Sequence, residues 1–155
     1  MPTNYGKAFE DKFKSDFIRT VPNCSLDRIY DVSLGYKSIS NISDYIGYSY
    51  PNIYYLECKS HKGASIPFTA ITQYEKLTKK VGIPGVRAGI ILWLYEKDIV
   101  MYVPISTITE IMKTEKKSVG IVDLDKYNIK VVPSIKKRVF MDSDYSVLLD
   151  LKDGE

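Results

Sequence analysis

The sequence has few of the residues that build the commonest metal and catalytic centres. It contains two cysteines, Cys24 and Cys58, and a single histidine, His61, among 155 residues. These are too few for a zinc-ligand cluster, a disulfide framework or a histidine-based catalytic triad. The chemistry therefore rests with carboxylates, lysine, arginine, tyrosine or glutamine, and any metal would have oxygen ligands. Two unpaired cysteines also favour a reducing cytoplasm.

Long apolar runs are absent as well. No run approaches the roughly 18 residues that a membrane span needs, and residues 1–14 alternate charge with phenylalanine instead of forming an export signal. We therefore expect a cytoplasmic protein with no membrane contact. The composition, 45% hydrophobic and 26% charged, is typical of a folded globular chain. A chain of this length buries one full hydrophobic core, so we predict a single domain over residues 1–155.

The residue pattern predicts a mixed sheet flanked by helices. In residues 7–19, phenylalanine recurs every four positions, at Phe9, Phe13 and Phe17, which indicates a helix with one buried stripe. Extended segments are predicted at residues 25–34, 53–59, 87–95, 99–103 and 129–132. One further helix is predicted to begin at a capping box in residues 72–75. Two more helices are predicted at residues 106–113 and 143–151. The predicted fold class is therefore α/β, with one mixed β-sheet flanked by helices.

The most informative strand is residues 53–59, which is apolar and aromatic for four residues and then charged. Because alternate residues of a strand share a face, Glu57 and Lys59 emerge together. A turn at residues 47–52 would return this strand beside Asp44, so that the two carboxylates meet. With the backbone carbonyl of Cys58 they form an oxygen environment suited to Mg²⁺ or Mn²⁺. Lys59 would then stabilise charge that develops on phosphorus.

Each candidate residue also has a purely structural explanation. Asp44 suits a turn, Glu57 and Lys59 suit an ion pair at a strand end, and Glu10 and Gln73 suit a solvent-facing surface. Taken one at a time, these explanations are favoured, because an Asp followed a dozen residues later by Glu-X-Lys occurs in many unrelated sequences. Only the joint pattern supports a functional interpretation.

Taken together, several segments resemble the RecU-type Holliday junction resolvases of the PD-(D/E)XK nuclease superfamily. The matching segments are Asn4-Tyr5-Gly6-Lys7-Ala8-Phe9-Glu10-Asp11, Ser43-Asp44-Tyr45-Ile46-Gly47-Tyr48, Leu56-Glu57-Cys58-Lys59-Ser60, Ser65-Ile66-Pro67-Phe68 with the downstream Gln73, and the short Lys117-Ser118 and Asp144-Tyr145. The resemblance implies a restriction-endonuclease-like fold with Asp44 and Glu57 as metal ligands and Lys59 as the catalytic lysine. It further implies Glu10 as an additional acid of the site and Gln73 as a supporting polar residue.

The activity that this resemblance implies is a Mg²⁺-dependent endodeoxyribonuclease, a Holliday junction resolvase that nicks two opposing strands of a four-way DNA junction. A symmetric substrate calls for two symmetric sites, so a homodimer is expected. One alternative is another PD-(D/E)XK nuclease that acts on duplex ends or specific sites. A second alternative is a DNA-binding module without catalysis, which two clustered acids disfavour because they repel phosphate.

Two segments are candidates for DNA contact. Residues 113–138 hold eight basic and three acidic residues, which is either a phosphate-binding surface or a solvated face. The candidate contacts there are Lys116, Lys117, Lys136, Lys137 and Arg138. Residues 34–43 correspond to the family's protruding stalk but are short, and Tyr36 could stack on a base while Lys37 neutralises phosphate. The alternative for this second segment is an ordinary connecting loop.

Overall fold

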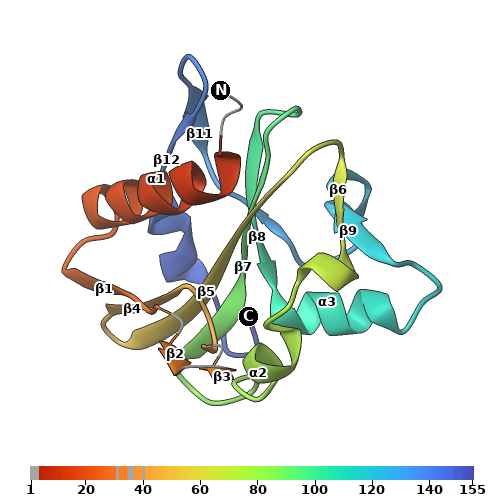
Figure 1. Cartoon of the computed structure of the whole chain (residues 1–155), viewed down its shortest axis with the longest axis horizontal. Coiled ribbons are helices and arrows are strands. Elements are labelled where there is room, and N and C mark those ends of the chain that lie inside the picture. Colours follow the sequence, from red (N-terminus) through yellow and green to blue (C-terminus); the bar gives the residue numbers. More distant parts are fainter. Residues whose placement is uncertain (1–3, 31, 35–36, 40) are drawn as a thin grey trace.

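A computed structural model describes residues 4–30, 32–34, 37–39 and 41–155. Its centre is a six-stranded sheet in the order β1-β4-β5-β7-β8-β10 (Figure 1). The strands are β1 (Cys24–Arg28), β4 (Tyr45–Ser49), β5 (Asn52–His61), β7 (Val86–Leu94), β8 (Ile99–Pro104) and β10 (Lys130–Val131). The β5–β7 pair is parallel and the other pairs are antiparallel. The predicted mixed α/β sheet is thus confirmed.

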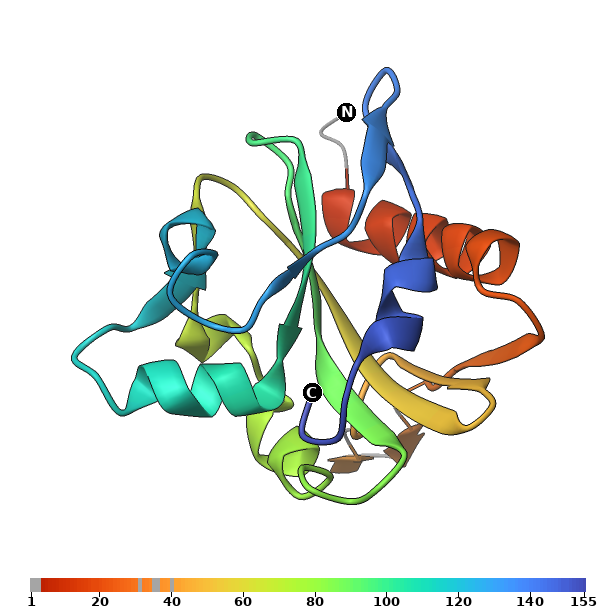
Figure 2. The ribbon, with the colours of Figure 1, turned by 180° about the vertical axis from the view of Figure 1, so that it is seen from behind.

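Helices cover both faces of the sheet (Figures 1 and 2). They are α1 (Tyr5–Thr20), α2 (Tyr74–Thr78), α3 (Ile105–Met112) and the 3₁₀ helices η1 (Phe68–Ala70), η2 (Ile121–Asp123) and η3 (Tyr145–Asp150). The helices α1 and η3 lie together on one face, and α2 and α3 lie on the other (Figures 1 and 2). Three small pairs complete the fold: β2 (Val32–Leu34) with β3 (Lys37–Ile39), β6 (Ser65–Pro67) with β9 (Ser118–Gly120), and β11 (Ser134–Lys136) with β12 (Met141–Ser143).

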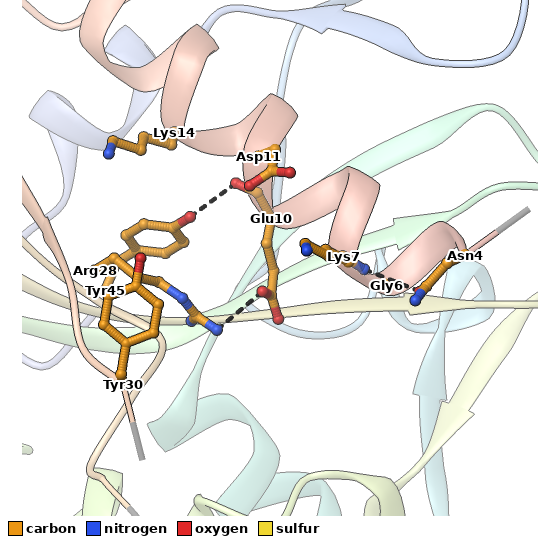
Figure 3. Close-up of a pocket in the computed structure, with 9 residues that line it drawn as sticks. All are labelled: Asn4, Gly6, Lys7, Glu10, Asp11, Lys14, Arg28, Tyr30 and Tyr45. Carbon is orange, nitrogen blue, oxygen red and sulfur yellow. Dashed lines mark hydrogen bonds and ion pairs between the residues drawn. The ribbon is translucent and has the colours of Figure 1, made fainter. Parts of the chain in front are cut away.

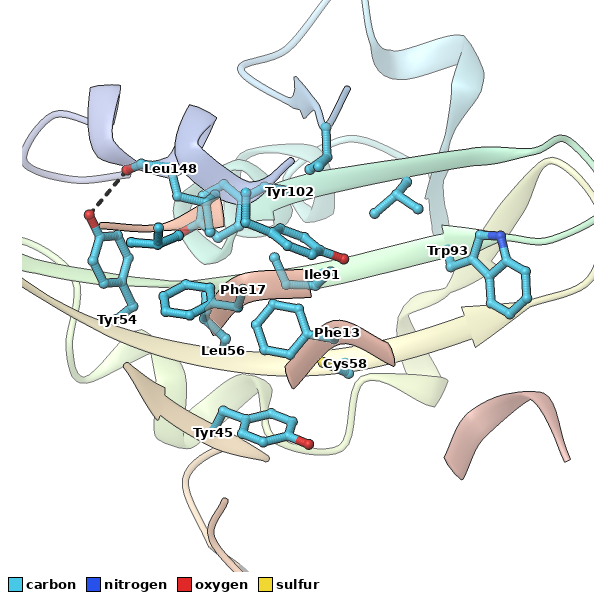
Figure 4. Packing of buried hydrophobic residues seen from close by; sticks show 14 of the residues in the cluster. Phe13, Phe17, Tyr45, Tyr54, Leu56, Cys58, Ile91, Trp93, Tyr102 and Leu148 are labelled. Carbon is cyan, nitrogen blue, oxygen red and sulfur yellow. Dashed lines mark hydrogen bonds between the residues drawn. The ribbon is translucent and has the colours of Figure 1, made fainter. Parts of the chain in front are cut away.

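The helix α1 is held on the sheet by its phenylalanine stripe, as the four-residue period predicts. Phe9, Phe13 and Phe17 are all buried, and Figure 4 shows Phe13 and Phe17 within the cluster. The Phe13 ring meets Tyr145 of η3 edge-on, with centroids 4.9 Å apart. At the N-terminus, the side chain of Asn4 accepts a hydrogen bond from the backbone N–H of Lys7. This packing fixes the positions of the other side chains of α1.

Ionic contacts also fasten α1 to the strand β12. The buried carboxylate of Asp16 accepts a hydrogen bond from the backbone N–H of Ser143 at 3.0 Å. The ammonium of Lys12 lies 2.9 Å from Asp16 and 2.6 Å from Asp142. The first helix of the chain is therefore clamped by residues more than 120 positions away in the sequence.

The hairpin of β4 and β5 forms as the turn at residues 47–52 predicts. Tyr45 pairs with Leu56, and the two strands remain in register to Ser49 and Asn52. Alternate residues of β5 take opposite faces: Leu56 and Cys58 pack into the cluster under α1 (Figure 4), whereas Tyr55 packs with the cluster under α2 and α3. Glu57 and Lys59 share the face of Tyr55.

Three predicted elements are wrong in detail. The strand predicted at residues 25–34 is divided, because its partner β4 begins only at Tyr45, opposite Arg28. The helix predicted at residues 143–151 is a 3₁₀ helix, since residues up to Ser143 belong to β12 and Asp144 caps η3 by accepting a bond from Ser146 N–H. The capping box predicted at residues 72–75 does not form, and Gln73 makes no side-chain capping bond to α2. None of the described helices is long and apolar enough to cross a membrane.

Candidate active site

The β4–β5 hairpin brings Asp44 against the charged end of β5. Asp44 lies directly before β4, one position beyond the Tyr45–Leu56 pair. Its Oδ2 accepts a hydrogen bond from the backbone N–H of Cys58 at 2.8 Å. The carboxylate of Asp44 is therefore fixed beside Glu57, as expected from the hairpin.

Glu57 is a buried carboxyl group with one unsatisfied oxygen. The residue is 4% exposed, and its Oε1 lies 3.3 Å from the ammonium of Lys59. Its Oε2 has no hydrogen-bond partner among the described residues. Burial, with the charge of Asp44 as a second cause, raises the pKa of Glu57 to about 7, and Lys59 only partly opposes this. A buried carboxylate with an unsatisfied oxygen is stabilised by binding a proton or a nearby cation.

Arg28 joins the two other acids of the site. Its guanidinium lies 3.0 Å from Oε2 of Glu10 (Figure 3) and 2.8 Å from Oδ1 of Asp44. The same group is placed between two aromatic rings, 5.5 Å from the centroid of Tyr30 and 5.3 Å from that of Tyr45. The four groups around Arg28 hold its charge in a fixed position.

Glu10 reaches this cluster from α1. The hydroxyl of Tyr45 donates a hydrogen bond to the backbone carbonyl of Glu10 at 3.0 Å, which ties the helix to the start of β4 (Figure 3). Burial raises the pKa of Glu10, and the nearby charge of Asp44 raises it further, while Arg28 acts in the opposite direction. The site thus holds three carboxyl groups, from α1, the loop before β4 and β5.

Sequence reasoning missed Arg28. Nothing in the local sequence distinguishes this residue from other basic residues, and the segment around it resembles no family motif. The signal lies in the pairing of strands, because Arg28 stands opposite Tyr45 in the ladder of β1 and β4 and so lies next to Asp44. This contact could have been predicted only from the correct pairing register of β1 with β4.

Five of the predicted site residues come together and one lies apart. Glu10, Asp44, Glu57, Cys58 and Lys59 are linked by the contacts given above, although the Cys58 thiol points into the core and only its backbone faces Asp44 (Figure 4). Gln73 lies at the start of α2, where it lines a different hollow of about 340 Å³ with Phe68 and Met112. Within the described residues, no hydrogen bond or ion pair joins Gln73 to the acids.

The available oxygen ligands fit a hard divalent cation that takes only a few of its ligands from the protein. In the part of the chain that the structure describes, no three histidine, cysteine or acidic side chains are close enough to hold a metal by themselves. Mg²⁺, however, commonly uses one or two carboxylates and keeps several waters. Asp44 and Glu57 supply two carboxylates, and the unpartnered buried Oε2 of Glu57 is a free oxygen ligand. The residues therefore fit Mg²⁺ or Mn²⁺.

The predicted DNA contacts are spread over separate parts of the surface. Lys116 and Lys117 precede β9, whereas Lys136, Lys137 and Arg138 belong to the β11–β12 hairpin, on the other side of the sheet (Figures 1 and 2). Three of these lysines already have ion pairs: Lys116 with the buried Asp123, Lys136 with Asp98 at 2.6 Å, and Lys137 with Asp142 at 3.7 Å. Tyr36 lies outside the described residues, and Lys37 belongs to β3, but its side chain is outside the description.

The fold resembles that of a known nuclease. The structure matches that of Hjc, a Holliday junction resolvase from the archaeal hyperthermophile Archaeoglobus fulgidus, with a TM-score of 0.57. The match covers 79% of this chain and 93% of that chain at 15% sequence identity, so the likeness is one of fold. No family model matches the sequence, and no curated protein matches it. The expected restriction-endonuclease-like fold class is thereby confirmed.

Proposed function

We propose that this protein is a Mg²⁺- or Mn²⁺-dependent endodeoxyribonuclease of the RecU type that resolves four-way DNA junctions by paired symmetric nicks. The observation that carries the proposal is the pairing of Asp44 with the backbone of Cys58 beside the buried, half-satisfied carboxyl of Glu57. This arrangement occurs on a fold that is also found in an archaeal Holliday junction resolvase. A module that only bound DNA would gain nothing from buried acids that repel phosphate.

The proposed roles follow from the position of each group. Asp44, Glu57 and the Cys58 carbonyl would hold the metal, which when bound supplies a water of lowered pKa and neutralises charge on the phosphate. Lys59, whose ammonium lies 3.3 Å from Glu57, would stabilise negative charge on the phosphate oxygens as the bond to phosphorus breaks. Glu10 would be a further acid of the site, and Gln73 a supporting residue that must approach from α2.

Junction recognition requires surfaces beyond the acids. We propose a homodimer of single-domain subunits, since a symmetric four-way junction presents two equivalent strands to two equivalent sites. Residues 34–43, with Tyr36 and Lys37, would form the protrusion that enters the junction. Backbone contacts would come from Lys116, Lys117, Lys136, Lys137 and Arg138.

Cleavage assays on matched substrates test this proposal. The protein is incubated with a labelled four-way junction, with a duplex and with single-stranded DNA, each in Mg²⁺, Mn²⁺ and EDTA. We expect paired nicks in the junction, weaker nicking of the duplex, and no product in EDTA. Asp44→Asn and Glu57→Gln should each abolish cleavage but leave junction binding equal or tighter, because each removes a ligand charge and a charge that repels phosphate.

Matched controls separate the chemistry from general loss of charge. Glu110→Gln and Asp125→Asn remove exposed acids far from the site and should cut at the wild-type rate. Lys59→Ala should lower the rate at least about 10²-fold, by analogy with the loss of one oxyanion donor. Wild-type cleavage by either Asp44→Asn or Glu57→Gln would refute the site, and equal cutting of duplex and junction would favour a duplex nuclease instead.

A further inference from the structure

A groove with a volume of about 480 Å³ runs beside the acidic cluster (Figure 3). One wall is the exposed side of α1, and the other is formed by the end of β1 with Tyr30 and Tyr45. Glu10 and Arg28 belong both to this groove and to the contacts with Asp44. The groove therefore adjoins the proposed cleavage site through Glu10 and Arg28, and its volume is within the range of small-ligand pockets, roughly 300–1,000 Å³.

The α1 wall carries two exposed lysines. Lys7 and Lys14 both line the groove, and neither has an ion pair within the described residues. They are seven residues apart, which places them on one side of the helix and about 10 Å apart along its axis. Asp11 lies between them on the helix. Together with Arg28, the two lysines give the groove three cations, and Asp11 and Glu10 give it two carboxylates. Two cations at this spacing can reach different phosphates of one DNA strand.

The opposite wall presents an exposed aromatic ring. Tyr30 is 73% exposed although it lines the groove, and the guanidinium of Arg28 lies over its ring. A cation on one side of a ring fixes its orientation and leaves the other side free. An exposed and oriented ring next to basic side chains is the arrangement by which proteins bind single-stranded nucleic acid, with bases on rings and phosphates on cations.

We propose that this groove binds the DNA strand on one side of the cleaved phosphate, as an unpaired strand. Lys7 and Lys14 contact its backbone and Tyr30 stacks on one of its bases. The inference rests on the proposed nuclease function, and it adds that the strand to be cut is separated from its complement next to the active site. Lys7, Lys14 and Tyr30 are therefore positioning residues for the substrate, not part of the acidic cluster.

The salt dependence of binding tests the two lysines. Affinity for a labelled single-stranded oligonucleotide is measured by fluorescence anisotropy in EDTA, where no cleavage interferes. The double variant Lys7→Ala/Lys14→Ala should make the slope of log K against log salt shallower by about 1.4, because each lost contact to single-stranded DNA removes about 0.7. The control Lys79→Ala/Lys97→Ala removes two exposed lysines elsewhere and should leave the slope unchanged. A wild-type slope in the Lys7/Lys14 variant overturns the proposal.

A base analogue tests Tyr30 directly. The fluorescent base 2-aminopurine is placed at successive positions of the oligonucleotide, and stacking on a protein ring is expected to quench it at one position. Tyr30→Phe keeps the ring and should keep the quenching, whereas Tyr30→Leu should lose it and bind about 5- to 100-fold more weakly. Tyr50, which is 83% exposed on the β4–β5 turn, provides the control variant Tyr50→Leu. Full quenching in Tyr30→Leu contradicts the proposed stacking.

The two proposals can fail separately. If Asp44→Asn abolishes junction cleavage but the groove variants bind like the wild type, the nuclease assignment stands and the groove inference is wrong. If the groove variants lose affinity as described while no DNA is cleaved in any metal, the groove inference stands as a binding site and the nuclease assignment is wrong.

Discussion

Glu57 combines burial, a neighbouring carboxylate and an unsatisfied oxygen, and this combination links its charge to the stability of the fold. Its pKa is raised to about 7, mainly by burial, whereas an exposed glutamate titrates near 4.3. The folded state therefore binds a proton at Glu57 more tightly than the unfolded state does. The stability associated with this proton is present below the unfolded pKa and is lost as the pH rises toward about 7.

We predict that metal-free protein becomes less stable between about pH 4.5 and pH 7, in the window set by the raised pKa of Glu57. At pH 8 in EDTA, Glu57→Gln should be more stable than the wild type, on the order of 2 kcal/mol, because it removes an unfavourable buried charge. At pH 5 the two proteins should unfold nearly alike. Urea unfolding at both pH values measures the difference. Glu110→Gln is the control, and a Glu57→Gln variant that is equally destabilised at both pH values would contradict the argument.

At the level of secondary structure elements, the position of α1 depends on its aromatic stripe. Phe13 is fully buried and contacts Phe17, Tyr45 and Tyr145. We predict that Phe13→Ala lowers the free energy of unfolding by about 3–5 kcal/mol, because it removes a large side chain from a packed core. Ile18→Ala, on the exposed side of the same helix, should change it by about 0.5 kcal/mol or less. Equilibrium denaturation of both variants tests the contrast.

Elements with a strong local pattern could be predicted from the sequence. The stripe of Phe9, Phe13 and Phe17 predicted α1, and the turn before β5 predicted the hairpin that places Asp44 beside Cys58. Contacts set by tertiary packing could not be predicted. Arg28 lies next to Asp44 only because β1 pairs with β4 in one register, and the 3₁₀ form of η3 depends on where β12 ends. The carboxylates that the structure brings together could therefore be named from the sequence, but the arginine between two of them could not.

At the level of the whole molecule, the basic residues are not equivalent, although they lie in one segment of the sequence. Lys117 and Arg138 are exposed and have no ion pair within the described residues, whereas Lys116 pairs with the buried Asp123, Lys136 with Asp98 and Lys137 with Asp142. A paired lysine reaches phosphate only by giving up its partner. The unpaired residues Lys117 and Arg138 should therefore contribute more to DNA affinity than the paired lysines.

We predict that replacing Lys117 and Arg138 by alanine makes the salt dependence of junction binding shallower by about 0.9 per lost contact. The comparison variant Lys116→Ala/Lys136→Ala should change this slope less. It should instead lower stability by on the order of 1 kcal/mol, since Asp123 loses a partner. Salt titrations of binding and thermal unfolding measure the two effects. Equal slopes for the wild type and the Lys117→Ala/Arg138→Ala variant would mean that these two residues only form a solvated face.

The clamp between α1 and β12 has a consequence for synthesis on the ribosome. Lys12 and Asp16 are made before their partners Asp142 and Ser143, which are separated from them by more than 120 residues and emerge after most of the described strands. Until then the Asp16 carboxylate lacks its hydrogen bond from the backbone N–H of Ser143, and the Phe13 ring lacks its contact with the ring of Tyr145. A nascent chain that ends before residue 141 can therefore hold α1 only by its contacts with the earlier strands, without those from β12 and η3. The position of α1, and with it that of Glu10, is thus fully fixed only after residues 141–145 have been synthesised.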